Sequence, residues 1–229
     1  RMPELVLDTE TTGLDPAEAR GATDSSVLEY LNHDANGPNH PAALGSGYAA
    51  RSAFRLLAEL PAWSLHIFNR GIGGDRVTSL QERWQADALA LKPDLLSILI
   101  GVNDTWHART GGEGTSLADY RRIYRDILTH TRDVLPQVRL VLCEPFFLPV
   151  EPAMADWEEE MSTRSAIVRD LAEDFEAVFV PFQGLFSELA QSAPAEYWLG
   201  DGVHPTAAGH THMALLWLHK VAGFAPAGP

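Results

Sequence analysis

Apolar runs alternate with amphipathic stretches along most of this chain. Four short runs consist almost entirely of hydrophobic residues, as expected for strands that are buried on both faces of a sheet. The longer segments between them have apolar residues at helical spacing, which predicts helices with one buried face. This alternation, with short connections, predicts an α/β fold, a three-layer α/β/α sandwich with a parallel sheet. The predicted strands are Leu65–Phe68, Leu95–Ile100, Val138–Cys143 and Ala177–Pro181.

Some of the predicted helices have recognisable ends. Ser79 and Glu82 have the spacing of a capping box, and Pro205 stands near the first position of the last helix. The run Glu158–Glu160 is expected to be a solvated helix face. With no obvious linker, residues 1–229 are expected to form one domain, with an atypical N-terminal segment over residues 1–25. The predicted helices are Tyr48–Leu60, Ser79–Leu91, Ser116–Val134, Trp157–Phe175, Leu185–Ala190 and Thr206–Val221.

The chain is acidic, with a formal net charge of −14 and a pI near 4.9. This charge argues against nucleic acid and anionic membranes as partners, because phosphate groups are bound by Lys and Arg patches. No apolar stretch approaches the ~18 residues of a membrane span, and residues 1–20 contain no apolar signal region. A cytoplasmic protein is expected, with the loss of a secretion signal as the alternative. The one cysteine, Cys143, is expected to fill the core.

Two of the predicted strands are followed by residues suited to binding a ligand. Asn103 comes just after the run Leu95–Ile100, and the glycine-rich stretch Gly71–Gly74 follows the run that ends at Phe68. In open parallel sheets, ligands bind beyond the carboxyl ends of the strands. An amide there can donate to a developing oxyanion, and glycines let the backbone turn sharply and expose an N–H. Trp106 is expected either to wall a sugar or acyl pocket or to belong to the core.

The segment Asp201–Pro205 contains an Asp and a His three residues apart, on a short turn before the last predicted helix. Asp201 and His204 can therefore form a hydrogen-bonded pair. Such a pair activates a hydroxyl nucleophile in many hydrolases. Together with Asn103, this segment predicts acyl-transfer chemistry.

The combination of these motifs resembles the SGNH (GDSL) hydrolases, from about Leu44 to Val221. By this resemblance, which implies a flavodoxin-like sandwich, Gly74 and Asn103 are the oxyanion residues, and Asp201 and His204 are the catalytic acid and base. The acetylxylan-esterase-like branch is the most similar, on the motifs Leu44–Tyr48, Arg83-Trp84, Lys92–Asp94 and Ile100–Trp106.

The resemblance implies a serine hydrolase that cleaves carboxylic esters, with acetyl or short-chain esters on carbohydrates as the expected substrates. Its partners are then a small-molecule or carbohydrate ester, with no nucleic acid and no membrane, and the chain is expected to form a homo-oligomer. The chemistry needs no metal and no organic cofactor. Two alternatives stay open: a lysophospholipase or thioesterase on the same machinery, and a catalytically silent domain that keeps the pocket.

The nucleophile is the piece that the sequence leaves open. Members of the family begin with a strand that leads into Gly-Asp-Ser, and this chain has no such motif. Counting back from Gly74 with the usual spacing of the family favours Ser26. Ser25 is the second candidate, because Asp24-Ser25 preserves the Asp-Ser pair. Thr9 is the third, because it follows Glu4–Leu7, the strand-like run at the N-terminus. The remaining alternative is a chain without a competent nucleophile.

The N-terminus carries a second resemblance. Residues 5–15 are similar to the first motif of proofreading-type 3′–5′ exonucleases, in which an Asp and a Glu two residues apart bind metal ions. Here these residues are Asp8 and Glu10. No later metal-binding motif follows, and the acidic charge disfavours DNA. The preferred interpretation is a substituted end of a hydrolase that supplies a first strand.

Overall fold

The structure, a computed structural model, describes residues 4–9 and 37–224 of the chain. Its centre is a parallel sheet of five strands in the order β2-β1-β3-β4-β5. All four strands predicted from apolar runs are present, and the run at the N-terminus forms β1, which lies between β2 and β3. The strands are β1 Glu4–Thr9, β2 His66–Asn69, β3 Leu95–Leu99, β4 Arg139–Cys143 and β5 Val178–Val180.

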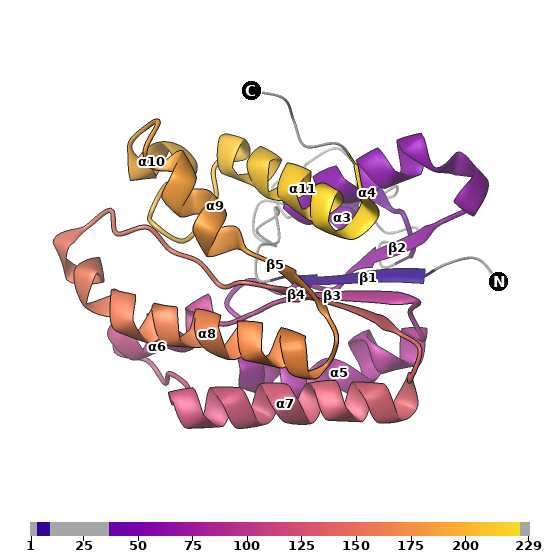
Figure 1. The fold of residues 1–229 in the computed structure, drawn as a ribbon, viewed down its shortest axis with the longest axis horizontal. Helices are drawn as coiled ribbons and strands as arrows, with labels where there is room; N and C mark the ends of the chain where they lie inside the picture. The colour runs from indigo at the N-terminus through magenta and orange to yellow at the C-terminus, as the bar shows by residue number, and fades with distance from the viewer. Residues whose placement is uncertain (1–3, 10–36, 225–229) are drawn as a thin grey trace, which may run out of the picture.

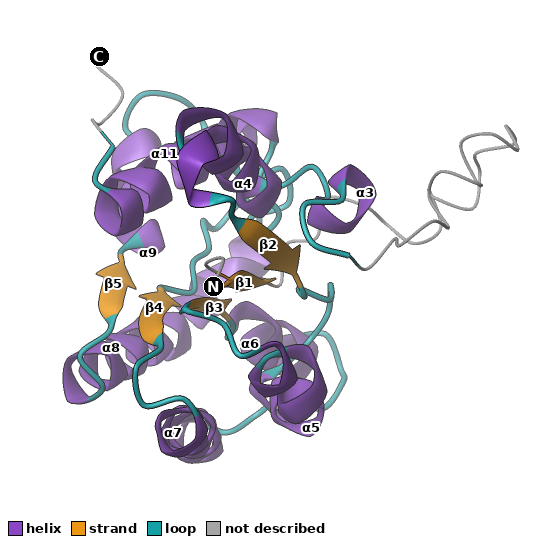
Figure 2. Ribbon diagram, turned by 90° about the vertical axis from the view of Figure 1, so that its right-hand side faces the viewer, coloured by secondary structure: helices purple, strands orange, loops and turns teal. Residues whose placement is uncertain are grey.

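Helices cover both faces of the sheet, as Figures 1 and 2 show. This is the predicted α/β/α sandwich. One layer consists of α3 Pro41–Leu44, α4 Tyr48–Glu59, α9 Phe182–Leu189, α10 Ala195–Trp198 and α11 Ala207–Ala222. The other consists of α5 Val77–Asp87, α6 Val102–Arg109, α7 Leu117–Val134 and α8 Glu158–Asp174. Three 3₁₀ turns complete the described elements: η1 Pro61–Trp63, η2 Leu89–Leu91 and η3 Pro152–Trp157.

Side chains of the buried strands alternate between two apolar cores, one under each helical layer. In β4, Val141 and Cys143 face the core under α4 and α11, and Leu140 and Leu142 face the core under α5, α7 and α8. Cys143 is fully buried, and burial raises the pKa of its thiol to about 12. This cysteine therefore packs as an apolar residue, as predicted.

The strand order places a topological switch point at β1. The chain passes from β1 to β2 on one side and then reaches β3 on the other side of β1. Loops that leave neighbouring strands in opposite directions open a crevice beyond the carboxyl ends of the strands, which is the usual ligand site of such sheets. The segment with Gly74 follows β2, and Asn103 follows β3, so both lie next to this point.

The capping box predicted at Ser79 is wrong. Helix α5 begins earlier, at Val77, and its N-cap residue Arg76 makes no capping bond with its side chain. The carboxylate of Asp104 supplies the cap instead, because its two oxygens accept from Val77 N at 3.3 and 3.2 Å. A partner that is distant in sequence has replaced the local one. The hydroxyls of Ser116 and Thr206 do cap their own helices, α7 and α11.

Candidate active site

Asp201 and His204 lie on a turn between α10 and α11 and are hydrogen bonded to each other. His204 Nδ1 is 2.7 Å from Asp201 Oδ2, and Asp201 Oδ1 accepts from His204 N at 2.8 Å. The imidazole is accessible, with 71% of its side chain exposed. The pair predicted from the sequence is therefore formed, with the other ring nitrogen of His204 directed away from this carboxylate.

The carboxylate determines the tautomer of the histidine. Partial burial raises the pKa of Asp201, but hydrogen bonds from the His204 backbone, the His204 ring and Val203 N outweigh it, and the net pKa lies below the ordinary value. An ionised Asp201 requires a proton on Nδ1 for the 2.7 Å bond. The lone pair of Nε2 is then available to accept a proton from a hydroxyl group.

Backbone contacts hold this turn in place. Gly202 has a φ of +92°, and its carbonyl accepts from Leu148 N at 2.8 Å. A Cβ at Gly202 would lie 2.5 Å from Leu148 O and 2.7 Å from Met154 Cε. Only glycine fits between these groups with that backbone conformation.

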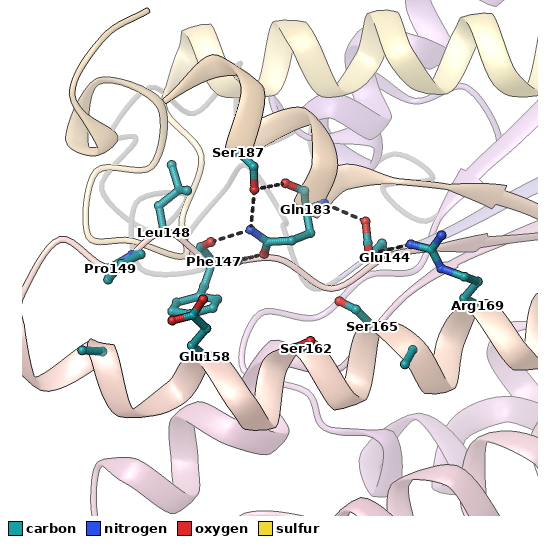
Figure 3. Close-up of a pocket in the computed structure, with 12 residues that line it drawn as sticks. Glu144, Phe147, Leu148, Pro149, Glu158, Ser162, Ser165, Arg169, Gln183 and Ser187 are labelled. Carbon is teal, nitrogen blue, oxygen red and sulfur yellow. Dashed lines mark hydrogen bonds and ion pairs between the residues drawn. The ribbon is translucent and has the colours of Figure 1, made fainter. Parts of the chain in front are cut away.

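The segment that contacts Gly202 is itself fixed by Gln183 at the start of α9 (Figure 3). The side chain of Gln183 bonds to both polar groups of Phe147: Phe147 N donates to Oε1 at 2.9 Å, and Nε2 donates to Phe147 O at 3.1 Å. Glu144 in turn accepts from Gln183 N at 3.0 Å. Burial, the largest influence, raises the pKa of Glu144. A chain of hydrogen bonds thus connects α9, through Phe147 and Leu148, to the turn that carries His204.

The oxyanion candidates Gly74 and Asn103 belong to two connected segments. Gly74 has a φ of +89°, as the sharp turn after β2 requires. Asn103, in the first turn of α6, donates from Nδ2 to Asp75 O at 3.2 Å. This bond orients the amide and ties the segment that follows β3 to the one that follows β2. Helix α6 itself was not predicted from the sequence.

Charged side chains brace this half of the site. Arg83 donates from Nε to Asp75 Oδ2 at 2.7 Å and from Nη1 to Arg70 O at 2.8 Å, so it holds both ends of the glycine-rich turn. Asp104, directly after Asn103, is completely buried. Burial raises the pKa of Asp104, and the charge of Arg164 and the hydrogen bond from Val77 N offset only part of this rise.

A second buried charge lies behind α6. Arg164 is fully buried and donates to Thr105 Oγ1 at 2.8 Å and to Glu160 Oε1 at 2.7 Å. Glu160 also bonds to Arg109, at 3.0 Å. The prediction that Glu158–Glu160 is a solvated face is therefore wrong for Glu160, which joins α8 to α6. Arg164 lies one helical turn further along α8, whereas Thr105 and Arg109 belong to α6, so the packing of α6 against α8 determines the position of Glu160.

An apolar cluster joins the two halves of the site. Val203, between Asp201 and His204, packs in one cluster with Val102, the residue before Asn103. Trp106 belongs to the same cluster, and its ring centroid is 6.1 Å from that of His204. The structure thus brings the Asp201–His204 turn next to the segment with Asn103.

The nucleophile candidates are described only in part. Ser25 and Ser26 lie outside the described residues, as does Glu10 of the exonuclease-like motif. Thr9 is the last residue of β1, paired with Leu99 of β3, and only its backbone is described. Within residues 4–9 and 37–224, no group of three or more His, Cys, Asp or Glu side chains could hold a metal ion. No helix in the same ranges is long and apolar enough to cross a bilayer.

Sequence reasoning missed three residues that organise the site. Arg83 was noted only as part of a motif, and Arg164 and Gln183 were not noted at all. The one available signal is an arginine at an apolar position of a helix, since Arg164 lies three residues from Met161 and Ile167, which are both buried. Gln183 gives no such signal, because its partners are backbone atoms.

A parallel α/β/α sandwich with a His–Asp pair near the carboxyl edge of its sheet has the arrangement of a hydrolase. Comparison with known sequences identifies the family: the model of the GDSL-like lipase/acylhydrolase family matches residues 33–212. The chain belongs to this family and is an ester hydrolase. The nucleophile candidates Thr9, Ser25 and Ser26 precede the matched residues.

Individual relatives agree with this assignment. An acetylxylan esterase from Geobacillus stearothermophilus is 30% identical over 184 residues, which cover 78% of this chain and 82% of the relative. A protein from Parabacteroides merdae, described as a GDSL-like lipase, has a TM-score of 0.84 at 35% identity, over 97% of this chain and 96% of that one. The solved acetylxylan esterase Axe2 from Geobacillus stearothermophilus has a TM-score of 0.78 at 26% identity, over 98% and 95% of the two chains. Catalytic mutants of that enzyme replace a serine or a histidine by alanine.

Proposed function

We propose that this chain is a serine hydrolase that removes acetyl or other short acyl groups from carbohydrate esters. The observation that carries the proposal is the 2.7 Å bond between His204 Nδ1 and Asp201 Oδ2, at the edge of the sheet where Asn103 also lies. The catalytic serine and histidine of the acetylxylan esterase support the same chemistry. The carbohydrate part of the proposal rests on what that relative is named to act on.

In the proposed mechanism, Ser26 attacks the carbonyl carbon of the ester while His204 Nε2 takes the hydroxyl proton. Asp201 stabilises the imidazolium that forms. The Gly74 N–H, the Asn103 amide and the N–H of the nucleophile donate to the oxyanion. The loss of one such donor typically lowers the rate by about 10²–10³-fold.

The tetrahedral intermediate then collapses, and the bond between the carbonyl carbon and the alcohol oxygen breaks. His204 gives its proton to the departing alcohol. A water molecule next attacks the acyl-serine, with His204 again as the base, and releases the carboxylic acid. Each turnover consumes one ester and one water, and the hydroxyl of Ser26 is restored.

The test is hydrolysis of p-nitrophenyl acetate in the presence of EDTA, by the wild-type protein and the variants Ser26→Ala, Ser25→Ala and His204→Ala. The proposal predicts an active wild type, background rates for Ser26→Ala and His204→Ala, and a largely active Ser25→Ala. Inactivity of the wild type on acetyl and longer esters alike would instead support a silent binding domain. Activity that EDTA abolishes would contradict the proposed mechanism, which uses no metal ion.

A further inference from the structure

A cavity of about 500 Å³ opens beside the His–Asp pair, between α6, η3 and the turn that carries Asp201. This volume lies within the roughly 300–1,000 Å³ of typical small-molecule sites, and an acetyl group alone would leave most of it empty. The described residues that determine its chemistry are Trp106, Arg109, Glu151, Asp156, Trp157 and Asp201.

Two tryptophans form the aromatic wall of this cavity. The rings of Trp106 and Trp157 meet edge to face, with centroids 5.4 Å apart. Trp157 is only 6% exposed and packs with Met154 and Val203, whereas Trp106 is half-buried. Packing against Trp157 therefore fixes Trp106 before any ligand binds. A fixed indole offers a flat apolar surface to the C–H face of a ring-shaped ligand at little entropic cost.

The polar groups of the cavity are mostly carboxylates. Glu151, Asp156 and Asp201 line it, and its one described cation, Arg109, bonds to Glu160 at 3.0 Å. Carboxylates accept hydrogen bonds from hydroxyl groups and repel phosphates and carboxylates. A long acyl chain would leave these charges desolvated and unpaired, at a cost in binding energy. The chemistry of the cavity thus favours a neutral ligand with several hydroxyl groups.

The cavity lies close to His204, because Trp106, which lines it, packs near the His204 ring. In ester hydrolysis, the base that activates the nucleophile must also reach the departing oxygen. The centroids of the Trp106 and His204 rings are 6.1 Å apart, so an alcohol whose oxygen is near His204 would extend toward Trp106.

We infer that this cavity is a subsite for the sugar part of the ester, in which a neutral pyranose ring packs on Trp106 and its hydroxyl groups donate to Glu151 and Asp156. This inference rests on the proposed function. It adds where the sugar binds and which residues select it. It also assigns Trp106 to the ligand pocket, although its inner edge contacts the apolar cluster.

The test compares kcat/KM for acetylated xylobiose with kcat/KM for p-nitrophenyl acetate, as a ratio within each variant. Trp106→Leu should lower this ratio by about 10-fold, and so should the double variant Glu151→Gln/Asp156→Asn. A loss of this size is expected when one or two polar or aromatic contacts with the substrate are removed. Matched controls are Trp63→Leu, at a tryptophan that is 59% exposed on η1, and Glu173→Gln, on the exposed face of α8.

An unchanged ratio in both subsite variants would overturn the inference. So would a selective loss on p-nitrophenyl octanoate, because the cavity would then hold the acyl chain. Failure of the proposed function can be told apart from failure of this inference, because the wild-type protein would then not hydrolyse p-nitrophenyl acetate. In that case binding of xylobiose, measured by isothermal titration calorimetry, decides the inference: wild type should bind and Trp106→Leu should not.

Discussion

The two halves of the candidate site are built in different ways. Buried or half-buried charges hold the oxyanion half: Arg83 braces the turn after β2, and Asp104 caps α5 from α6. The half with the general base has an exposed pair, 71% exposed at His204 and 49% at Asp201, on a turn held by backbone bonds and close packing at Gly202.

The difference fits the task that we propose for each half. An oxyanion donor must keep a fixed orientation, and charged hydrogen bonds give it that rigidity. A general base must stay accessible to a hydroxyl and to the leaving alcohol, so few side chains can cover it. The oxyanion half should therefore be sensitive to changes in charge, and the base half to changes in shape.

The largest effect should come from a change of shape in the base half. Gly202→Ala places a Cβ 2.5 Å from Leu148 O, at a backbone φ of +92° that side chains rarely adopt. Displacing the turn by about 1 Å should lower kcat on p-nitrophenyl acetate by about 10²-fold. The control is Gly184→Ala in α9, where the new Cβ would be 3.9 Å from Pro181 Cβ. Equal activity of the two variants would contradict the account.

A smaller effect should follow from a change of charge in the oxyanion half. Arg83→Gln removes the bonds to Asp75 Oδ2 and Arg70 O, so the segment with Gly74 loses its brace. We expect kcat to fall by about 10-fold with little change in KM. Arg55→Gln, which breaks the exposed pair with Glu59, is the control. If both substitutions have the same small effect, the oxyanion half does not depend on this charge.

Gln183→Met should act on the base half from a distance. It removes both hydrogen bonds to Phe147 and keeps a side chain of similar length. Because the connection to Gly202 runs through one further residue, kcat should fall by only about 3- to 5-fold. Ser187→Ala, which removes another contact of Gln183 Nε2 but leaves Phe147 untouched, should resemble the wild type. A Gln183→Met variant with wild-type kcat would show that the hydrogen bonds between Gln183 and Phe147 do not position the turn.

The smallest effect concerns stability alone. Burial, followed by the charges of Arg51 and His204, lowers the pKa of His210 from 6.5 to about 4, and its Nδ1 accepts from Tyr48 N. The unfolded chain therefore takes up a proton before the folded protein does as the pH falls. This contribution to stability is complete above about pH 6.5 and is lost toward pH 4, with a slope of at most about 1.4 kcal/mol per pH unit.

His210→Asn keeps an acceptor for Tyr48 N and removes this titration. Urea unfolding at several pH values between 7 and 4.5 should show a shallower loss of the free energy of unfolding than in the wild type. His130→Asn, at an exposed position on α7, controls for the loss of a histidine. An unchanged slope in His210→Asn would mean that His210 is not held neutral in the folded protein.

Much of the fold could be predicted from the sequence, because the strands overlap with mostly apolar runs that stand out from their flanks. Asp201 and His204 could be predicted as a pair because both lie within one short turn. Asp104 as the cap of α5, and Glu160 as a link between α8 and α6, could not be predicted. The partner of Asp104 lies 27 residues away and those of Glu160 on α6 lie 51 and 55 residues away, so the fold rather than local spacing brings these groups together.

The nucleophile is the point where the sequence is least informative, and labelling tests it most directly. The protein should be incubated with a fluorophosphonate, which forms a covalent bond with an activated hydroxyl, and the modified residue identified by peptide mass spectrometry. The account predicts one modified residue, Ser26, and no modification in His204→Ala. Modification of Ser25 or Thr9 would contradict the assignment of Ser26, and a wild-type protein that remains unmodified would contradict the serine hydrolase itself.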